Sequence, residues 1–215
     1  MTAVVWFRND LRSLDHRALS AACAKHQNVR GLYLLSPKQL DEHIIAPIRR
    51  HYLRRALDEL GRQLGDLGIV FDIIDAGHFT DATKHLGNYC RDHQIDEIRR
   101  DAACIEAGVP LTLIDDSLLS PLDIATGDGG PYKVFTPFSR RCRTQLMANF
   151  PVCSRRPKAV ADKIDNAPCP PFGQERDASA WPANQDHVLE QLRGFCAERA
   201  HDYREYRDIP DLDNT

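Results

Sequence analysis

The sequence predicts an α/β protein with a doubly wound, mostly parallel five-stranded Rossmann-like sheet and helices on both faces, followed by an extended linker and a short C-terminal helix. Two observations lead to this fold class. Apolar runs rich in β-branched and aromatic residues, at positions 4–7, 29–35 and 69–74, are typical of strands buried on both faces. Helical segments alternate with these runs, and that alternation predicts parallel strands with helices packed on both sides.

The first strand–helix unit opens the chain. Strand 4–7 runs into a polar loop, 8–13, and Asp15 is the expected N-cap of a helix whose apolar positions include Leu19. The loop leaves the carboxyl end of its strand, where doubly wound sheets bind their ligands. We therefore expect the functional edge of the sheet near this loop.

A long amphipathic helix follows the second strand. Pro47 suits its first turn, apolar residues recur every four positions, and Gly68 ends it. The arginines between positions 49 and 62 lie mostly on its other faces. Such a charged run is typical of a solvated helix face, and a docking face for a second domain is the alternative.

The second half of the sheet is expected from shorter signals. Thr80 or Asp81 caps a helix that runs to about residue 93, and segment 111–114 forms the last strand. Segment 95–98 begins the fourth strand, because an apolar residue directly after a polar helix end is typical of a helix-to-strand junction.

Composition divides the chain into three parts. Residues 1–150 form the α/β domain. Six prolines between positions 151 and 182 predict an interdomain linker over 151–186. An apolar stripe then predicts a helix at the start of segment 187–215.

Charge and cysteine content exclude several classes of protein. The net charge of −3 gives no basic excess that would attract a polyanion. The seven cysteines are scattered, odd in number and never spaced C-x-x-C, which favours reduced thiols and argues against a zinc site. No apolar run approaches the roughly 18 residues of a membrane span, and no leader precedes the first strand, so we expect a cytoplasmic protein without a membrane partner.

Three motifs with fixed spacing then indicate the protein family more closely. Positions 6–19 read W-F-R-x-D-L-R-x-x-D-x-x-A-L, positions 37–49 read P-x-Q-x-x-x-H-x-x-x-P-x-R, and positions 126–138 read T-G-x-x-x-x-Y-x-V-F-T-P-F. Together they resemble the amino-terminal antenna domain of the DNA photolyases and cryptochromes. No Ser/His/Asp set, clustered metal ligands or glycine-rich phosphate loop accompanies them, which argues against an unrelated nucleotide-binding α/β protein.

The resemblance implies a folate antenna pigment, methenyltetrahydrofolate. It assigns His43, in the loop after the second strand, as a pigment contact. In the family an Asn-Glu pair grips the pterin ring, and Asp96 and Glu97 stand nearest to it in this sequence.

About ten residues of the family pattern are missing near position 98. In one alignment the segment 94–97 replaces the pterin loop and the preceding strand is absent. In the other, which we favour, 95–98 begins the fourth strand, and its remainder and the pterin loop are deleted before Arg99. Because a central strand satisfies two rows of backbone groups, either version predicts a less stable or re-paired sheet.

The resemblance also implies FAD as the cofactor of the full-length proteins. Segment 187–215 is similar to the start of their flavin domain, with Tyr203 and Thr215 at flavin-contacting positions. We therefore expect an antenna domain of a deoxyribodipyrimidine photo-lyase, which repairs pyrimidine dimers in damaged DNA with light. Because the FAD domain is absent from this chain, it should be inactive alone. The alternative is a stand-alone binding module for a pigment or for a protein partner, such as a helical FAD domain.

Overall fold

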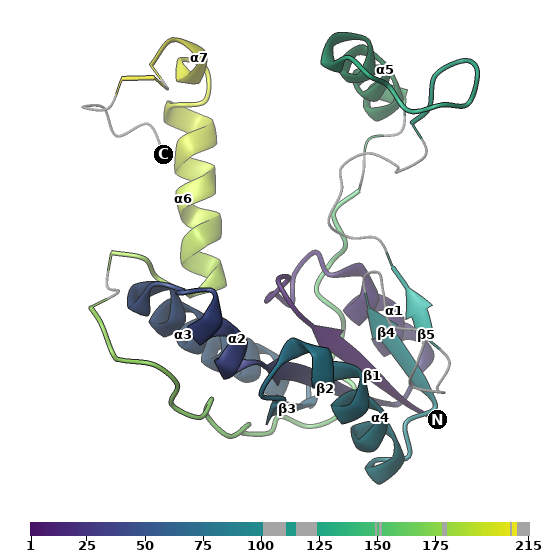
Figure 1. The fold of residues 1–215 in the computed structure, drawn as a ribbon, viewed down its shortest axis with the longest axis vertical. Helices are drawn as coiled ribbons and strands as arrows, with labels where there is room; N and C mark the ends of the chain where they lie inside the picture. The colour runs from purple at the N-terminus through teal and green to yellow at the C-terminus, as the bar shows by residue number, and fades with distance from the viewer. Residues whose placement is uncertain are drawn as a thin grey trace.

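The computed structural model describes residues 1–100, 111–114, 124–148, 150, 152–177, 180–206 and 208–209. A parallel sheet in the order β3-β2-β1-β4-β5 forms its centre (Figure 1). Its strands are β1 (Thr2–Phe7), β2 (Asn28–Leu35), β3 (Val70–Asp75), β4 (Glu97–Arg100) and β5 (Leu111–Leu113). The helices are α1 (Arg17–Lys25), α2 (Pro37–Glu42), α3 (Pro47–Gly65), η1 (Phe79–Asp81), α4 (Ala82–Asp92), α5 (Phe135–Ala148), α6 (Gln185–Glu198) and α7 (Tyr203–Tyr206).

Two apolar layers cover the two faces of the sheet. Successive β1 side chains point to opposite faces, so Val5 and Phe7 pack with α1 and α3, while Val4 and Trp6 pack with α4. All four are buried. The predicted α/β class with helices on both faces of a parallel sheet is therefore confirmed.

The cap of α1 differs from expectation. His16, not Asp15, is the N-cap, and its Nδ1 accepts a hydrogen bond of 3.0 Å from the amide of Leu19. Asp15 instead adopts a left-handed φ of 52°. Its carboxylate accepts a 2.6 Å bond from the amide of Ser154, and its own amide donates to the Ser154 carbonyl at 2.9 Å. The aspartate thus ties the first loop to a distant segment.

The fourth strand is present and paired on both sides. Ile98 of β4 lies opposite Val4 of β1 and Leu111 of β5. The alignment in which this strand is absent is therefore wrong. The favoured alignment also needs correction, because Arg99 and Arg100 belong to β4 rather than following a deletion. The sheet pairs continuously through β1, β4 and β5. Segment 101–110, which follows β4, lies outside the described residues.

Residues 152–177, which we call the strap, run along the α/β body without regular secondary structure. Backbone bonds join Val160 to the Leu67 carbonyl at 2.9 Å and Ile164 to the Gly65 carbonyl at 3.1 Å. Cys169 is buried in the same core as α3. The strap lies within the predicted linker, and these contacts fix it to the domain.

The side chain of Asn166 makes three hydrogen bonds from the strap to the α/β body. Its side-chain Oδ1 accepts from the Phe71 amide at 2.9 Å. Its Nδ2 donates to the carbonyls of Ile69, at 3.0 Å, and Gly61, at 2.9 Å. Phe71 lies on β3, the edge strand of the sheet, and Ile69 directly precedes that strand. One amide side chain therefore satisfies backbone groups that a sixth strand would otherwise bind.

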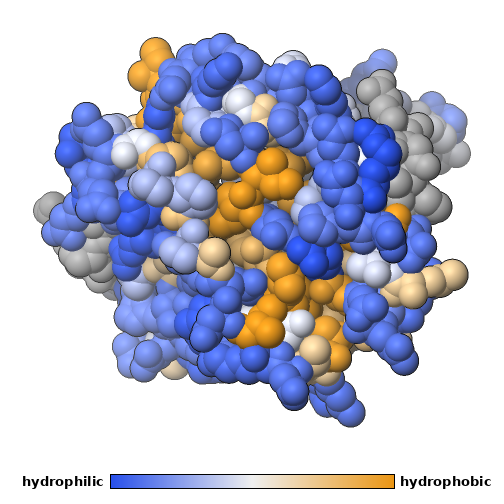
Figure 2. Space-filling model, turned by 90° about the horizontal axis from the view of Figure 1, so that it is seen from below, coloured by the Kyte–Doolittle hydropathy of each residue, from blue (hydrophilic) through white to orange (hydrophobic). Residues whose placement is uncertain are grey.

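Two helical arms rise from one side of the body. Figure 1 shows α5 and α6 projecting in the same direction, and neither helix has a buried residue. Gln185, at the start of α6, accepts a 3.4 Å bond from the amide of Ser13 in the first loop. Seen from below, hydrophobic residues gather in a band across a mostly hydrophilic surface (Figure 2).

Candidate functional site

A cavity of about 190 Å³ lies at the carboxyl ends of β1 and β2. Its apolar wall comes from the two strand ends, and its polar rim comes from the loops that follow them. The lining includes Trp6, Phe7, Arg8, Asn9, Tyr33, Leu34, Leu35, Ser36, Gln39, Leu40, His43, Ile45 and Phe79. The cavity therefore occupies the edge at which a doubly wound sheet binds ligands, as the first loop predicts.

The rim combines a cation, an aromatic ring and an unused polar atom. The guanidinium carbon of Arg8 lies 4.6 Å from the centre of the Phe79 ring, in cation–π geometry. The Ser36 Oγ is buried and has no hydrogen-bond partner among the described residues. Burial raises the pKa of Tyr33 to about 12, so its phenol stays neutral at pH 7. These groups can hold a planar ligand that carries polar edges.

His43 stands at the mouth of this cavity. It is exposed and occupies the C-cap position of the short helix α2. The structure therefore brings His43 together with Gln39 of the same motif and with the end of β1. The predicted location of the histidine, in a loop after the second strand, fits this arrangement.

A buried Asp–His pair supports the loop behind the rim. The His16 Nε2 lies 2.7 Å from the Asp10 carboxylate, and the two side chains are 2% and 19% exposed. Burial by itself would raise the pKa of Asp10, but the hydrogen bond and charge of His16, together with the amides of Arg8 and Asp10, lower it to about 2. Because His16 also caps α1, the pair fixes the geometry between β1 and that helix.

Asp96 and Glu97 do not join His43, contrary to the predicted pterin contacts. They stand at the start of β4, and in a parallel sheet the amino ends of the strands lie at the edge opposite the carboxyl ends. Asp96 accepts a 2.7 Å bond from the Thr2 amide. Glu97 is buried and bonds Lys25 and His26, each at 2.8 Å, and Thr112 at 2.7 Å. Both carboxylates have structural partners, so we do not retain them as pigment contacts.

The flavin positions are only partly described. Tyr203 lies on α7, 43% exposed, with its ring 5.6 Å from that of Phe195 in an edge-to-face contact. Thr215 lies outside the described residues. The structure therefore does not test whether the two come together.

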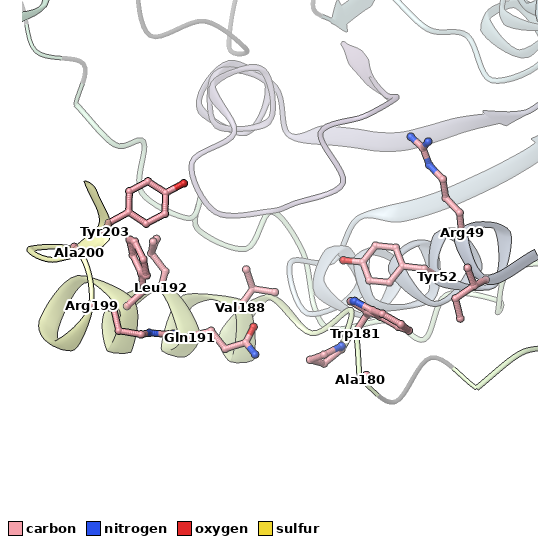
Figure 3. A pocket seen from close by; sticks show the side chains of 13 residues that line it. Arg49, Tyr52, Ala180, Trp181, Val188, Gln191, Leu192, Arg199, Ala200 and Tyr203 are labelled. Atoms are coloured by element: carbon pink, nitrogen blue, oxygen red, sulfur yellow. The ribbon is translucent and has the colours of Figure 1, made fainter. Parts of the chain in front are cut away.

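Tyr203 does line a second, larger hollow of about 1120 Å³ between α3 and α6 (Figure 3). Aromatic side chains and two arginines dominate it. Its members include Arg49, Tyr52, Trp181, Val188, Leu192, Phe195, Arg199 and Tyr203. The Trp181 side chain is 59% exposed and Leu192 is 54% exposed, so this groove presents much apolar surface to solvent.

The carboxyl-edge cavity fits one ring of the implied folate better than the whole molecule. Pockets that enclose a drug-sized ligand measure roughly 300–1,000 Å³, so this smaller cavity suits a bicyclic ring whose substituents extend outside it. The buried, unpartnered Ser36 Oγ offers a hydrogen bond to such a ring, and His43 and Gln39 can reach its edge. For FAD, the described residues supply no comparable enclosed site with both predicted contacts.

Sequence reasoning missed several residues that shape these hollows. Phe79 begins η1, after β3, and only the order of the strands brings it next to Arg8. Trp181 lies in the proline-rich segment, and nothing in its neighbourhood signals a groove wall. The signal available for Ser36 was its place directly before Pro37, at a strand's carboxyl end.

Other kinds of site find little support in the described part of the chain. No group of three or more His, Cys, Asp and Glu side chains there could hold a metal ion. Nor does any helix in that part have the length and apolarity to cross a membrane.

Fold and cavity together define a class: a doubly wound α/β domain with a ring-sized ligand cavity at the carboxyl edge of its sheet. Comparison gives the family, because a family model described as DNA photolyase matches residues 3–157. The chain belongs to the DNA photolyase family.

Individual relatives agree with this assignment. The chain is 33% identical over 235 residues to the deoxyribodipyrimidine photo-lyase of Salmonella typhimurium, covering 100% of this chain and 50% of that protein. It is 34% identical over 237 residues to the Vibrio cholerae enzyme of the same name, covering 99% and 50%. A class III photolyase from Agrobacterium tumefaciens has the same fold, with a TM-score of 0.72, 20% identity and coverage of 100% and 48%. The chain thus spans about half the length of these relatives.

Proposed function

We propose that this chain is the antenna domain of a deoxyribodipyrimidine photo-lyase and that it holds methenyltetrahydrofolate in the carboxyl-edge cavity. The observation that carries the proposal is the position of His43 at the mouth of a ring-sized cavity between the ends of β1 and β2. The photo-lyase names of the relatives supply the reaction class.

The residues of this chain bind and orient the pigment rather than react with it. Trp6 and Leu34, which pack in the same apolar layer, form a wall that excludes water from one face of the ring, and Phe7 lines the cavity from the other face of the sheet. His43, Gln39 and the Ser36 hydroxyl hydrogen-bond its polar edge. The pigment, once bound, absorbs light and passes the energy on, which requires a rigid orientation but no acid, base or nucleophile.

We assign the repair of damaged DNA to an FAD-bearing helical domain. That domain would cover the groove between α3 and α6, whose exposed aromatic residues resemble the apolar centre of a protein interface. On this proposal the 215 residues alone restore no thymines when incubated with dimer-containing DNA under blue light. Repair by the purified chain would refute this division of labour.

The test of pigment binding is a titration of the chain with methenyltetrahydrofolate, followed by absorbance and fluorescence. Saturable binding is expected, and His43→Ala should weaken it by about tenfold, the effect of losing one hydrogen bond of roughly 1.4 kcal/mol. His93→Ala is a matched control, because His93 is an exposed C-cap residue like His43 but follows α4. Absence of binding by the folded wild-type chain would overturn the proposal.

A second candidate function is that of a binding module for a protein partner. The exposed faces of α5 and α6 favour it, since neither helix buries a residue and Phe135 and Met147 are 76% and 84% exposed. Co-purification with a separate helical flavoprotein would support this candidate. If Leu192→Glu, in the groove, left that association unchanged, the groove would not be the docking surface.

A further inference from the structure

The residue that follows His43 has an unusual backbone conformation. Ile44 has a φ of 50°, in the left-handed region that a β-branched side chain rarely adopts. Its side chain is 87% exposed, so burial does not compensate for this conformation. Strained residues of this kind persist only where surrounding contacts determine them, and they concentrate at ligand-binding sites.

The hydrogen bonds around Ile44 form a helix C-cap that normally contains glycine. The Ile45 amide donates to the Leu40 carbonyl at 3.1 Å, and the Ile44 amide donates to the Asp41 carbonyl at 3.0 Å. This pair of bonds is the Schellman pattern, in which glycine is the usual residue at the position that Ile44 occupies. Isoleucine at this position therefore makes the turn after His43 less favourable than glycine would.

One side chain, Arg50 on α3, fixes this turn from outside. Its Nε donates to the Ile45 carbonyl at 2.9 Å, and one terminal nitrogen donates to the Leu40 carbonyl at 2.6 Å. Its other terminal nitrogen bonds the Asp41 carboxylate. The guanidinium side chain is 16% exposed, so water competes little for these bonds. Arg50 thus joins both ends of the turn that carries His43.

We propose that Arg50 is a positioning residue for the pigment: it holds the turn 40–45 in its strained form and so fixes His43 at the cavity mouth. The inference rests on the proposed function, because it concerns the same site. Arg50 does not line the cavity; its three bonds go to Leu40, Asp41 and Ile45, of which Leu40 and Ile45 do. Without them, the strain at Ile44 favours release of the turn.

The first measurement needs no ligand. Amide hydrogen exchange at Ile44 and Ile45 should accelerate roughly tenfold or more in Arg50→Gln, because the turn loses its three charge-assisted bonds to the guanidinium. The core amides of Leu57 and Leu60, farther along α3, should keep their protection. Arg62→Gln is the control, as it removes surface ion pairs from the same helix at a distance from the turn.

The second measurement is the titration with methenyltetrahydrofolate. Arg50→Gln should raise the Kd by about tenfold, comparable with His43→Ala. Adding Ile44→Gly to Arg50→Gln should recover part of the affinity and of the amide protection, because glycine adopts the left-handed turn without strain. Such rescue is not expected if Arg50 merely stabilises the whole domain.

The outcomes separate the two proposals. If the wild type binds and His43→Ala weakens binding, but Arg50→Gln binds like the wild type, the positioning role is wrong and the pigment site stands. Equal loss of protection at Leu57 and Leu60 would also overturn the positioning role, since it would reveal global destabilisation. If the folded wild type binds no pigment, the proposed function fails and this inference fails with it.

Discussion

Replacing Asn166 by alanine tests how the strap is held. The substitution removes three hydrogen bonds at once, to the Phe71 amide and to the carbonyls of Ile69 and Gly61. Each such bond contributes about 1 kcal/mol net, so their loss should lower the free energy of unfolding by about 3 kcal/mol. Because the site is only partly buried, water can satisfy some of the released backbone groups. The loss in free energy of unfolding should therefore be at least roughly 2 kcal/mol.

The assay is thermal unfolding followed by circular dichroism. For a domain of this size a change of 1 kcal/mol shifts Tm by about 2–4 °C, so a loss of about 2–3 kcal/mol in Asn166→Ala should lower Tm by roughly 4–12 °C. Asn28→Ala is the matched control, because Asn28 is exposed and the described residues give its side chain no hydrogen bond. A Tm for Asn166→Ala within 2 °C or so of the control would refute the reasoning, given the size of the expected effect.

Two further predictions concern ionisable groups. Because the pKa of Asp10 falls from 3.8 to about 2 on folding, its ionised form stabilises the native state by about 2 kcal/mol above pH 4, and this contribution is lost as pH falls toward 2. Urea unfolding at pH 6 and at pH 3 should show a smaller loss of stability for Asp10→Asn than for the wild type; an equal loss would contradict the lowered pKa. Glu97→Gln should reduce stability by about 2–3 kcal/mol, because a buried carboxylate loses its charge beside Lys25 and His26, yet leave pigment affinity unchanged. Weakened pigment binding by a Glu97→Gln chain that is still folded at the assay temperature would contradict this prediction and favour the pterin role of Glu97.

Local sequence patterns predicted the fold well where the residues of an element alone determine it. The apolar run 4–7 is buried on both faces, as its composition indicates, and Pro47 begins α3. The cap of α1 was harder to predict, because Asp15 is the better cap by residue type. Asp15 instead bonds Ser154, a residue 139 positions away, and so does not cap the helix.

The site was predicted only in part, for a related reason. His43 could be placed because its loop follows a strand end, which fixes the edge of the sheet on which it lies. The position of Asp96 and Glu97 at the opposite edge was not visible in the sequence, because the family pattern is shortened nearby and their place at the start of β4 depends on pairing with β1. The contacts of Arg50 with the turn after α2 were not visible either, because Arg50 belongs to a run of helix arginines that is typical of a solvated face.

The bonds of Asn166 also have a consequence for the order of events during synthesis. Phe71 and Asn166 are 95 residues apart, so the open edge of β3 is complete long before the side chain that covers it has been made. At roughly 5–20 residues per second, a ribosome needs on the order of 5–20 s to add that stretch. During this interval the nascent sheet exposes unpaired backbone groups of the kind through which strands of different chains associate. The strap thus determines how long a newly made copy of this domain is open to aggregation.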